Sequence, residues 1–375
     1  MASGTGSSTS TMSLRSPSAA ELSEWDGLVS RLEGGDTAQK SGWATLRSAA
    51  GFDARYLFLR SADGLVGGAQ VLVRRIPMIG TVGYISNGPL LDEARTERGS
   101  ALRSICDRLV DMAGSELAVL MIQPPDGRDD VSNELLRRGF RVSAAGVAPA
   151  TTLRLALDRP EDEIRAGLSK RLRRWTRQWE RRGVTVRTAT EDDLSTVARL
   201  LGETARFHGF DPFPESYLRT MYRTFASRDE VQIRLGEVSG EPVVCEVLTG
   251  CAGVVRSRLI GTDRSTRWEH LNVSAAVQWD AILWARGAGY RWFDFGGVGP
   301  ESARRLASGS PLVTDGLPGP DVFKIRFGGH LHTYPQAVEW FRSPVLRATY
   351  DLGRRSERGR RVLGTVRNRL RNAVA

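Results

Sequence analysis

The sequence contains few cysteines, almost no lysine and no long apolar run. Its three cysteines, Cys106, Cys245 and Cys251, are an odd number without paired spacing, which argues against a disulfide framework and fits a reducing compartment. No apolar stretch approaches the roughly 20 residues that a membrane-spanning helix requires. The Ser/Thr/Gly-rich residues 1–20 lack the apolar segment of a signal peptide, so we expect a disordered leader and a cytoplasmic protein.

Positive charge is supplied almost wholly by arginine. The 375 residues include 53 Lys+Arg and 43 Asp+Glu, which gives a net charge of +10 in an otherwise ordinary globular composition. After Phe341, ten arginines stand against Asp351 and Glu357, so residues 342–375 form a basic C-terminal tail that holds most of the excess. Such a tail could bind the phosphates of RNA, make peripheral contact with an anionic membrane surface, or simply be solvated.

The chain repeats one order of secondary structure. In the first half, two strand-like runs flank a Ser-Ala-Asp-Gly turn (54–75), and a further strand (80–91), an amphipathic helix (93–113) and a buried strand (117–125) follow. In the second half, a hairpin around Ser239-Gly240, another strand, a helix (273–290) and a strand ending in glycines follow in the same order. The economical interpretation is a duplicated α+β unit with mostly antiparallel sheets.

A basic segment joins the two halves. Pro160 begins a predicted helix from Glu161 to Arg182, with acidic residues at its start and basic residues toward its end, and Gly183 ends it. Its basic residues are Lys170, Arg171, Arg173, Arg174, Arg177, Arg181 and Arg182. The segment is either a solvated helix or one wall of a groove for polyphosphate or RNA.

Five motifs occur in an order that resembles the FemABX family of aminoacyl-tRNA-dependent peptidyltransferases, which build peptidoglycan cross-bridges. They are AQKSGWATLR, YISNGPLLD, SKRLRRWTRQWERRGV, FDFGGV and FKIRFGG. The resemblance extends from about Glu21 to about Phe341, and the absence of a helical-arm insertion places the chain with compact members. It implies two tandem GNAT-like (acyl-CoA N-acyltransferase-type) domains, in which a splayed strand pair accommodates the acyl donor.

The resemblance also implies how the chain divides into domains. Residues 21–150 plus 320–341 would form the first, acceptor-side domain, and residues 151–319 the second. No cofactor is expected, because aminoacyl-tRNA is the co-substrate.

Lys324, in FKIRFGG, matches the family lysine that is proposed to stabilise the oxyanion when an amine attacks the aminoacyl ester. A fixed cation suits that task, and Phe323 would pack beneath it. Asp92, which ends YISNGPLLD, resembles the carboxylate that orients or deprotonates the attacking amine. The alternatives are a strand-end lysine that reaches solvent and a turn or helix-cap aspartate.

The resemblance also implies further substrate-binding residues. Tyr84, Asn87 and Gly88 match the segment that lines the acceptor-peptide cleft, although the family usually has Pro-Arg where this chain has Ser86-Asn87. Asp294, in FDFGGV, would fix the loop beside the donor cleft.

Two basic positions of the family contact the diphosphate of a muramyl pentapeptide. They are matched by Arg47 and by Arg206, with Thr204 and His208 alongside; both arginines could instead be ordinary surface residues. His330 and His332 share one strand face, but no cysteine or acidic cluster accompanies them, so we expect no metal site.

The expected function is transfer of an amino acid from aminoacyl-tRNA to an amine of a peptide acceptor, most simply a nucleotide- or lipid-linked muramyl pentapeptide. One alternative keeps the donor and replaces the acceptor with a small peptide-like natural product. Another is a non-catalytic RNA- or membrane-binding protein on the same fold.

Overall fold

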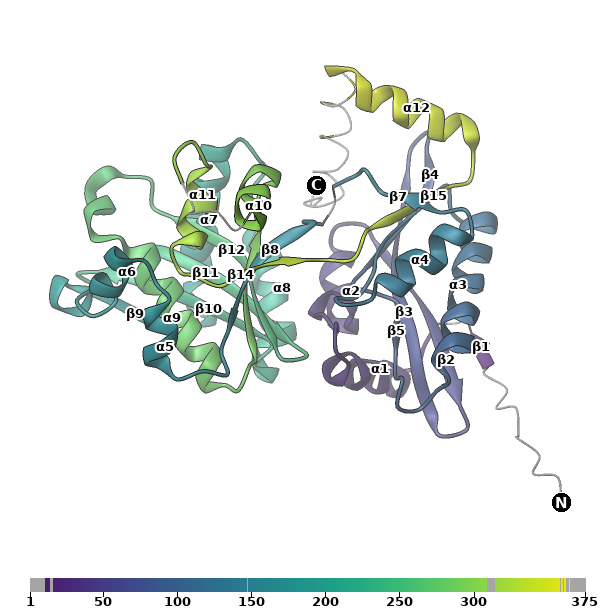
Figure 1. The fold of residues 1–375 in the computed structure, drawn as a ribbon, viewed down its shortest axis with the longest axis horizontal. Helices are drawn as coiled ribbons and strands as arrows, with labels where there is room; N and C mark the ends of the chain where they lie inside the picture. Colours follow the sequence, from purple (N-terminus) through teal and green to yellow (C-terminus); the bar gives the residue numbers. More distant parts are fainter. Residues whose placement is uncertain are drawn as a thin grey trace. The chain divides into compact units, whose positions relative to one another are not determined.

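The computed structural model describes residues 11–13, 16–146, 148–308 and 314–357, with 359, 361 and 364 (Figure 1). Most of the expected leader and the end of the basic tail therefore lie outside the described residues. Within the leader range, residues 11–13 form a strand and a helix begins at Ala19. Of the helices that the structure describes, none is both long enough and apolar enough to span a membrane.

The chain folds into two compact units. The first contains the chain up to Ala148 and resumes at Pro335, and the second contains Pro149–Tyr334. The boundary at Ala148 lies close to the one expected from the sequence.

The first unit is built on an eight-stranded sheet in the described part of the chain, in the order β1-β2-β3-β4-β6-β15-β7, with β5 paired to β3. Its strands are β1 (Thr11–Ser13), β2 (Asp53–Ser61), β3 (Gly64–Ile76), β4 (Gly80–Ser86), β5 (Leu90–Leu91), β6 (Val119–Gln123), β7 (Arg141–Val142) and β15 (Val338–Phe341). The pair β4–β6 is parallel, and the other described pairs are antiparallel.

Helices cover this sheet. They are α1 (Ala19–Arg31), the 3₁₀ helix η1 (Thr37–Gln39), α2 (Ser41–Ser48), α3 (Arg98–Ser115), α4 (Asp129–Arg137) and α12 (Pro344–Arg355). Ser18 and Glu21 form a reciprocal capping box that fixes the start of α1. Trp25 on α1 is fully buried and donates its indole N–H to the Gln39 carbonyl at 2.6 Å, which ties the AQKSGW motif into the core.

The second unit has a seven-stranded sheet among the described residues, in the order β14-β8-β13-β12-β11-β10-β9. Its strands are β8 (Thr151–Ala156), β9 (Val184–Thr188), β10 (Val231–Val238), β11 (Glu241–Cys251), β12 (Val254–Thr262), β13 (Trp292–Gly297) and β14 (His330–Thr333). Its helices are α5 (Glu161–Ala166), α6 (Lys170–Trp175), η2 (Glu180–Arg182), η3 (Glu191–Asp193), α7 (Leu194–His208), α8 (Glu215–Phe225), η4 (Ala226–Arg228), η5 (Thr266–Leu271), α9 (Val273–Gly287), α10 (Pro300–Ala307) and α11 (Gly319–Ile325).

The two sheets share one topology, which confirms the expected tandem α+β architecture. The series β2-β3-β4-α3-β6 corresponds to β10-β11-β12-α9-β13, and each series ends in a strand parallel to its third strand. Beyond that strand lies an antiparallel neighbour from elsewhere in the chain, β15 beside β6 and β8 beside β13. The returning segment β15 therefore completes the first sheet.

The return itself begins later than the expected residue 320. Residues 319–334 remain in the second unit, because β14 pairs with β8 and because Phe327 and Phe323 pack in the second core. Lys324 therefore belongs to the second unit. The sequence had placed it in the first unit, with residues 320–341.

The predicted continuous helix from Glu161 to Arg182 is also wrong. It is divided into α5, α6 and η2, and the break falls at Gly167–Ser169. Ser169 has extended backbone angles, caps α6 through Leu172 N, and donates its own N–H to the Arg326 carbonyl at 2.8 Å. A contact with a distant segment therefore interrupts a helix that the local sequence favours.

A buried carboxyl lies between the second sheet and α9. Glu246 on β11 is almost fully buried and accepts a hydrogen bond from Gln278 Nε2 at 2.9 Å. Burial raises the pKa of Glu246 to about 7, although hydrogen bonds from Ser257 and Gln278 and the charge of Arg234 oppose the rise. The protein should consequently become less stable when this carboxyl has to ionise.

We predict that Glu246→Gln stabilises the protein above neutral pH. Between the unfolded pKa of about 4.5 and the folded value of about 7, the unfolded state loses a proton that the folded state retains, so the stability of the wild type falls as pH rises. Glutamine cannot ionise and should recover up to about 3 kcal/mol near pH 8, with little gain below pH 4.5. Urea unfolding across this range measures the difference. Glu241→Gln, exposed on the same strand, is the control, and equal pH profiles for the three proteins would contradict the prediction.

Candidate active site

A buried carboxylate lies where the parallel strands of the second unit stop pairing. Strand β12 pairs with β13 from Val254↔Trp292 to Arg256↔Asp294, and β12 then continues to Thr262 paired only with β11. In the first unit, by contrast, β4 and β6 stay paired over five positions, from Val82 to Ser86. The divergence expected of an acyl-donor site is thus found in the second unit.

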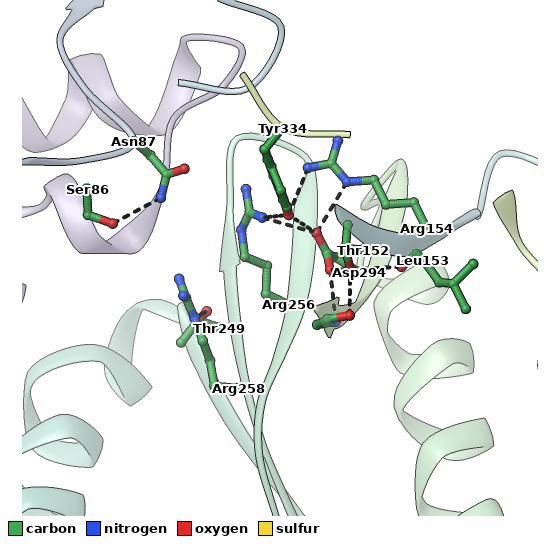
Figure 2. A network of polar contacts seen from close by, with 11 residues as sticks. Ser86, Asn87, Thr152, Leu153, Arg154, Thr249, Arg256, Arg258, Asp294 and Tyr334 are labelled. Atoms are coloured by element: carbon green, nitrogen blue, oxygen red, sulfur yellow. Dashed lines mark hydrogen bonds and ion pairs between the residues drawn. The ribbon is translucent and has the colours of Figure 1, made fainter. Parts of the chain in front are cut away.

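Asp294 is 1% exposed and is surrounded by donors (Figure 2). Its carboxylate accepts hydrogen bonds from Thr152 Oγ1 at 2.6 Å and from the Gly296 backbone N–H at 2.9 Å. Arg256 Nη1 lies at 3.1 Å and Arg154 Nε at 3.3 Å. Residues from β8, β12 and β13 therefore meet at one carboxylate.

Tyr334 completes the cluster. Its hydroxyl donates to Asp294, and the guanidinium groups of Arg154 and Arg256 lie 5.2 and 5.6 Å from the centre of its ring. Burial alone would raise the pKa of Asp294, but Arg256, Thr152, Tyr334 and Arg154 outweigh it, so that pKa lies below its usual value. Burial raises the pKa of Tyr334 to about 12. The carboxylate therefore stays charged and the phenol stays a donor.

Lys324 lies beside the end of β13, which comes three residues after Asp294. It is carried by α11, and its Nζ donates to the Gly297 carbonyl at 2.6 Å. Burial lowers the pKa of Lys324, while the charges of Asp321 and Asp294 oppose that change. Two motifs far apart in the sequence, FDFGGV and FKIRFGG, thus form one site.

The segment around Lys324 is held by aromatic packing and by two glycines. Phe327 is fully buried, with its ring centre 5.2 Å from that of Phe323 and 5.7 Å from that of Phe295. Gly328 and Gly329 both have positive φ, and a Cβ on them would lie 2.8 Å from the Gly167 carbonyl oxygen and 2.5 Å from that of Arg154, respectively. Only glycine allows this close approach.

A basic surface adjoins the same segment. Its exposed residues are Lys170, Arg171, Arg173, Arg174, Arg177, Arg181 and Arg182. The hydrogen bond from Ser169 N to Arg326 O connects the start of α6 directly to the end of α11. The basic surface and Lys324 therefore lie in the same unit, on two segments that a hydrogen bond joins.

The candidate acceptor residues lie in the first unit. Asp92 follows β5, is largely buried, and accepts a hydrogen bond from Arg31 Nη2 at 3.3 Å. Tyr84 is on β4, Asn87 adopts a positive φ, and the Gly88 N–H donates to the Gln123 carbonyl. The structure thus places these three motif residues along the end of β4 and the turn that follows it.

The two candidate diphosphate ligands have different surroundings. Arg47 in the first unit is 8% exposed, and its guanidinium lies 4.7 Å from the ring centre of Phe52. Arg206 in the second unit is exposed, and its side chain forms no hydrogen bond or ion pair with the residues that the structure describes.

The residues alongside Arg206 on α7 have partners. Thr204 Oγ1 accepts the Thr262 N–H at 2.9 Å, so it anchors the end of β12. His208 is exposed, and its Nε2 lies 3.4 Å from Arg264 Nη2. Of the three candidates on α7, Arg206 has the side chain that is best placed to meet a ligand.

The sequence did not identify four members of the Asp294 cluster: Thr152, Arg154, Arg256 and Tyr334. One signal in the sequence could have identified Arg154: in TTLRLAL, an arginine lies between apolar residues of a predicted buried strand. His330 and His332 do lie on β14, and in the described part of the chain no group of three His, Cys, Asp or Glu side chains is arranged to hold a metal ion.

These features define a protein with tandem GNAT-like domains. A family model described as an acetyltransferase (GNAT) domain matches residues 166–304, which include β12, β13 and Asp294. A solved structure of FemX aligns with a TM-score of 0.72 at 18% identity and covers 87% of this chain and 98% of its own. A tandem GNAT protein from the clavulanic acid biosynthesis pathway aligns with a TM-score of 0.51 at 10% identity, over 90% of this chain and 99% of its own. At these identities both structures show the fold.

Lipid II:glycine glycyltransferase of Staphylococcus aureus (strain MRSA252) is 25% identical over 236 residues, which are 60% of this chain and 55% of that protein. The chain thus spans about half the length of the curated relatives it matches. The sequence similarity to this glycyltransferase supports a relation to the FemABX family, and the family model and the FemX structure support two GNAT-like domains.

We predict that Gly329→Ala destabilises the protein by at least about 2 kcal/mol, because the substitution adds a Cβ against the Arg154 carbonyl and strains a positive φ. The control is Gly202→Ala in α7, where no neighbouring atom lies within 4 Å. That change should stabilise the protein by up to about 1 kcal/mol, since alanine favours a helix interior. Urea unfolding compares the two variants. A wild-type midpoint for Gly329→Ala would mean that the segment after α11 does not pack against β8 as described.

Proposed function

We propose that the protein transfers an aminoacyl group from aminoacyl-tRNA to an amine of a peptide acceptor. The observation that carries the proposal is the ammonium group of Lys324, fixed against Gly297 beside the diverging ends of β12 and β13. The similarity to the FemABX family supports it.

The chemistry is aminolysis of an ester. The acceptor amine attacks the ester carbonyl, a C–N bond forms, the C–O bond to the terminal ribose breaks, and the proton lost by the amine ends on the ribose oxygen. The tetrahedral intermediate carries an oxyanion, which a preorganised cation stabilises strongly in a water-poor site. Lys324 has three donor hydrogens, and one is committed to Gly297.

The basic surface is assigned to the tRNA donor. Closely spaced arginines on α6 and η2 suit the phosphates of a folded RNA, and counterion release would make that binding depend on salt. The hydrogen bond from the Ser169 N–H to the Arg326 carbonyl would hold this basic surface next to the reacting ester.

The acceptor is proposed to be a peptidoglycan precursor, a muramyl pentapeptide. The relative in Staphylococcus aureus is named a lipid II:glycine glycyltransferase, which supports a lipid- or nucleotide-linked peptide as the acceptor here. Arg206, exposed on α7, is assigned to its diphosphate.

We expect Lys324→Met to slow transfer by about two to three orders of magnitude, the usual loss when one oxyanion donor is removed. The assay incubates the protein with a pool of charged tRNAs and muramyl pentapeptide and detects the added aminoacyl mass by mass spectrometry. Ribonuclease treatment of the donor should abolish the product. Arg326→Met, an exposed neighbour on the same segment, should retain most of the activity. Unchanged turnover in Lys324→Met would remove this lysine from the reaction, and transfer that survives ribonuclease would exclude a tRNA donor.

The identity of the acceptor is tested at Arg206. Because a charge-assisted contact contributes about 1.5 to 3 kcal/mol, Arg206→Ala should weaken binding of nucleotide-linked muramyl pentapeptide at least about tenfold. Removing the nucleotide and its diphosphate should weaken wild-type binding similarly. Arg199→Ala on the same helix is the control, whereas Arg47→Ala would also remove packing on Phe52. If the wild type binds both acceptor forms equally, or neither, the peptidoglycan acceptor is wrong and a small peptide-like acceptor without a diphosphate replaces it.

A further inference from the structure

Large apolar side chains are exposed at one end of the first unit. Met78, in the turn between β3 and β4, is 104% exposed, and Val345 and Leu352 on α12 are 74% and 68% exposed. A group of exposed apolar side chains is energetically unfavourable in water, and such a group commonly marks a surface that binds a protein or a membrane.

The sheet register places the turn and the helix at the same end. Strand β4 begins at Gly80, just after the turn, and Thr81 O accepts the Ala118 N–H immediately before β6. The Ala118 carbonyl in turn accepts the N–H of Arg342, which follows the end of β15. Helix α12 starts two residues later, so it lies at the end of the sheet where β4 begins (Figure 1).

Polar and aromatic contacts hold α12 to this unit and leave Val345 and Leu352 facing outward. The Tyr350 ring centre lies 5.1 Å from that of Phe341, and Asp351 accepts two hydrogen bonds from Arg141, at 2.8 and 2.9 Å. Val345 and Leu352 are seven residues apart, so they share one helix face, roughly opposite to Tyr350. An ordinary surface helix buries its large aliphatic residues, whereas α12 leaves Val345 and Leu352 exposed.

The apolar residues are accompanied by arginine. Arg74 and Arg75 precede the turn, Arg342 precedes α12, and Arg354 and Arg355 end it. The acidic residue of α12, Asp351, is already paired with Arg141. This end of the unit therefore presents positive charge around exposed aliphatic groups.

We propose that this end of the first unit, defined by Met78, Val345, Leu352 and the neighbouring arginines and called here the lipid-docking surface, binds an anionic phospholipid surface. Aliphatic side chains insert among acyl chains near the headgroups while arginines pair with lipid phosphates. RNA is a poorer match, because the three exposed side chains offer no ring on which a base can stack. The inference does not depend on the transferase activity proposed above.

Vesicle sedimentation with the full chain tests the inference. The protein should bind vesicles of phosphatidylcholine with about one-third phosphatidylglycerol, should not bind phosphatidylcholine alone, and should be released by salt. The double variant Val345→Ser/Leu352→Ser should bind at least about tenfold more weakly, since two inserted aliphatic groups are lost. The matched control is Phe207→Ser/Phe210→Ser, which removes exposed apolar residues of the second unit and should bind as the wild type does.

A site-specific probe gives a second readout. The cysteines Cys106, Cys245 and Cys251 are buried, so a cysteine introduced as Leu352→Cys can be labelled selectively with an environment-sensitive dye. Its emission should shift to the blue with anionic vesicles, and a dye at Phe207→Cys should show no shift.

Several results would overturn the inference. They are absence of binding to anionic vesicles, an equal loss in the control variant, or an unshifted dye at position 352. If Arg342→Gln and Arg355→Gln weaken binding of tRNA while vesicles are ignored, the surface binds RNA. If the wild type dimerises and Val345→Ser/Leu352→Ser does not, the surface instead meets a second copy of this chain.

Discussion

The buried charge of Asp294 is the constraint on which the second unit depends. A carboxylate that is 1% exposed is tolerable only where cations and donors replace water, and here Arg154, Arg256, Thr152 and Tyr334 do so. The donors come from three segments that are far apart in the chain: β8, β12 and the segment after β14. The ends of β8, β12 and β13 and the segment after β14 must therefore assemble together, and removal of any one partner would leave charge or hydrogen-bonding capacity uncompensated in the interior.

The position of Lys324 follows from the same constraint. Tyr334 must reach Asp294, so the chain stays with the second sheet through β14 and leaves it only at Pro335. Helix α11, which precedes β14, is then packed against the turn after β13, and Lys324 meets Gly297. A lysine is suited to this place because burial lowers its pKa and strengthens its ammonium as a hydrogen-bond donor, whereas arginine would bring a wide planar group.

The two units share one topology but differ in the side chains that it positions. In the first unit, β4 and β6 stay paired, and the long hairpin and α12 carry apolar groups at one end of the sheet. In the second, β12 and β13 diverge at a charged cluster. The two sheets are thus alike in topology, and the side chains at the strand ends distinguish them, as expected when function depends on sites and not on the fold.

The sequence by itself determined the repeated hairpins, helices and strands of the two units and their order. Apolar alternation and three-to-four spacing predicted the hairpins, α3 and α9, because these periods record which face of each local element is buried. The repeated order predicted two α+β units. The motifs FKIRFGG and FDFGGV indicated Lys324 and Asp294 as site residues, but they did not show that the two motifs are in contact.

The tertiary structure decided what depends on contacts between distant segments. Gly167, Leu168 and Ser169 interrupt a helix that the local sequence favours, because Ser169 bonds to Arg326 and Gly328 lies against the Gly167 carbonyl. Residues 320–334 belong to the second unit because β8 is the partner of β14, which no local pattern encodes. Arg154, Arg256 and Tyr334 remained unrecognised for the same reason: one strand shows an arginine facing inward, but only the folded sheet shows the carboxylate that it faces.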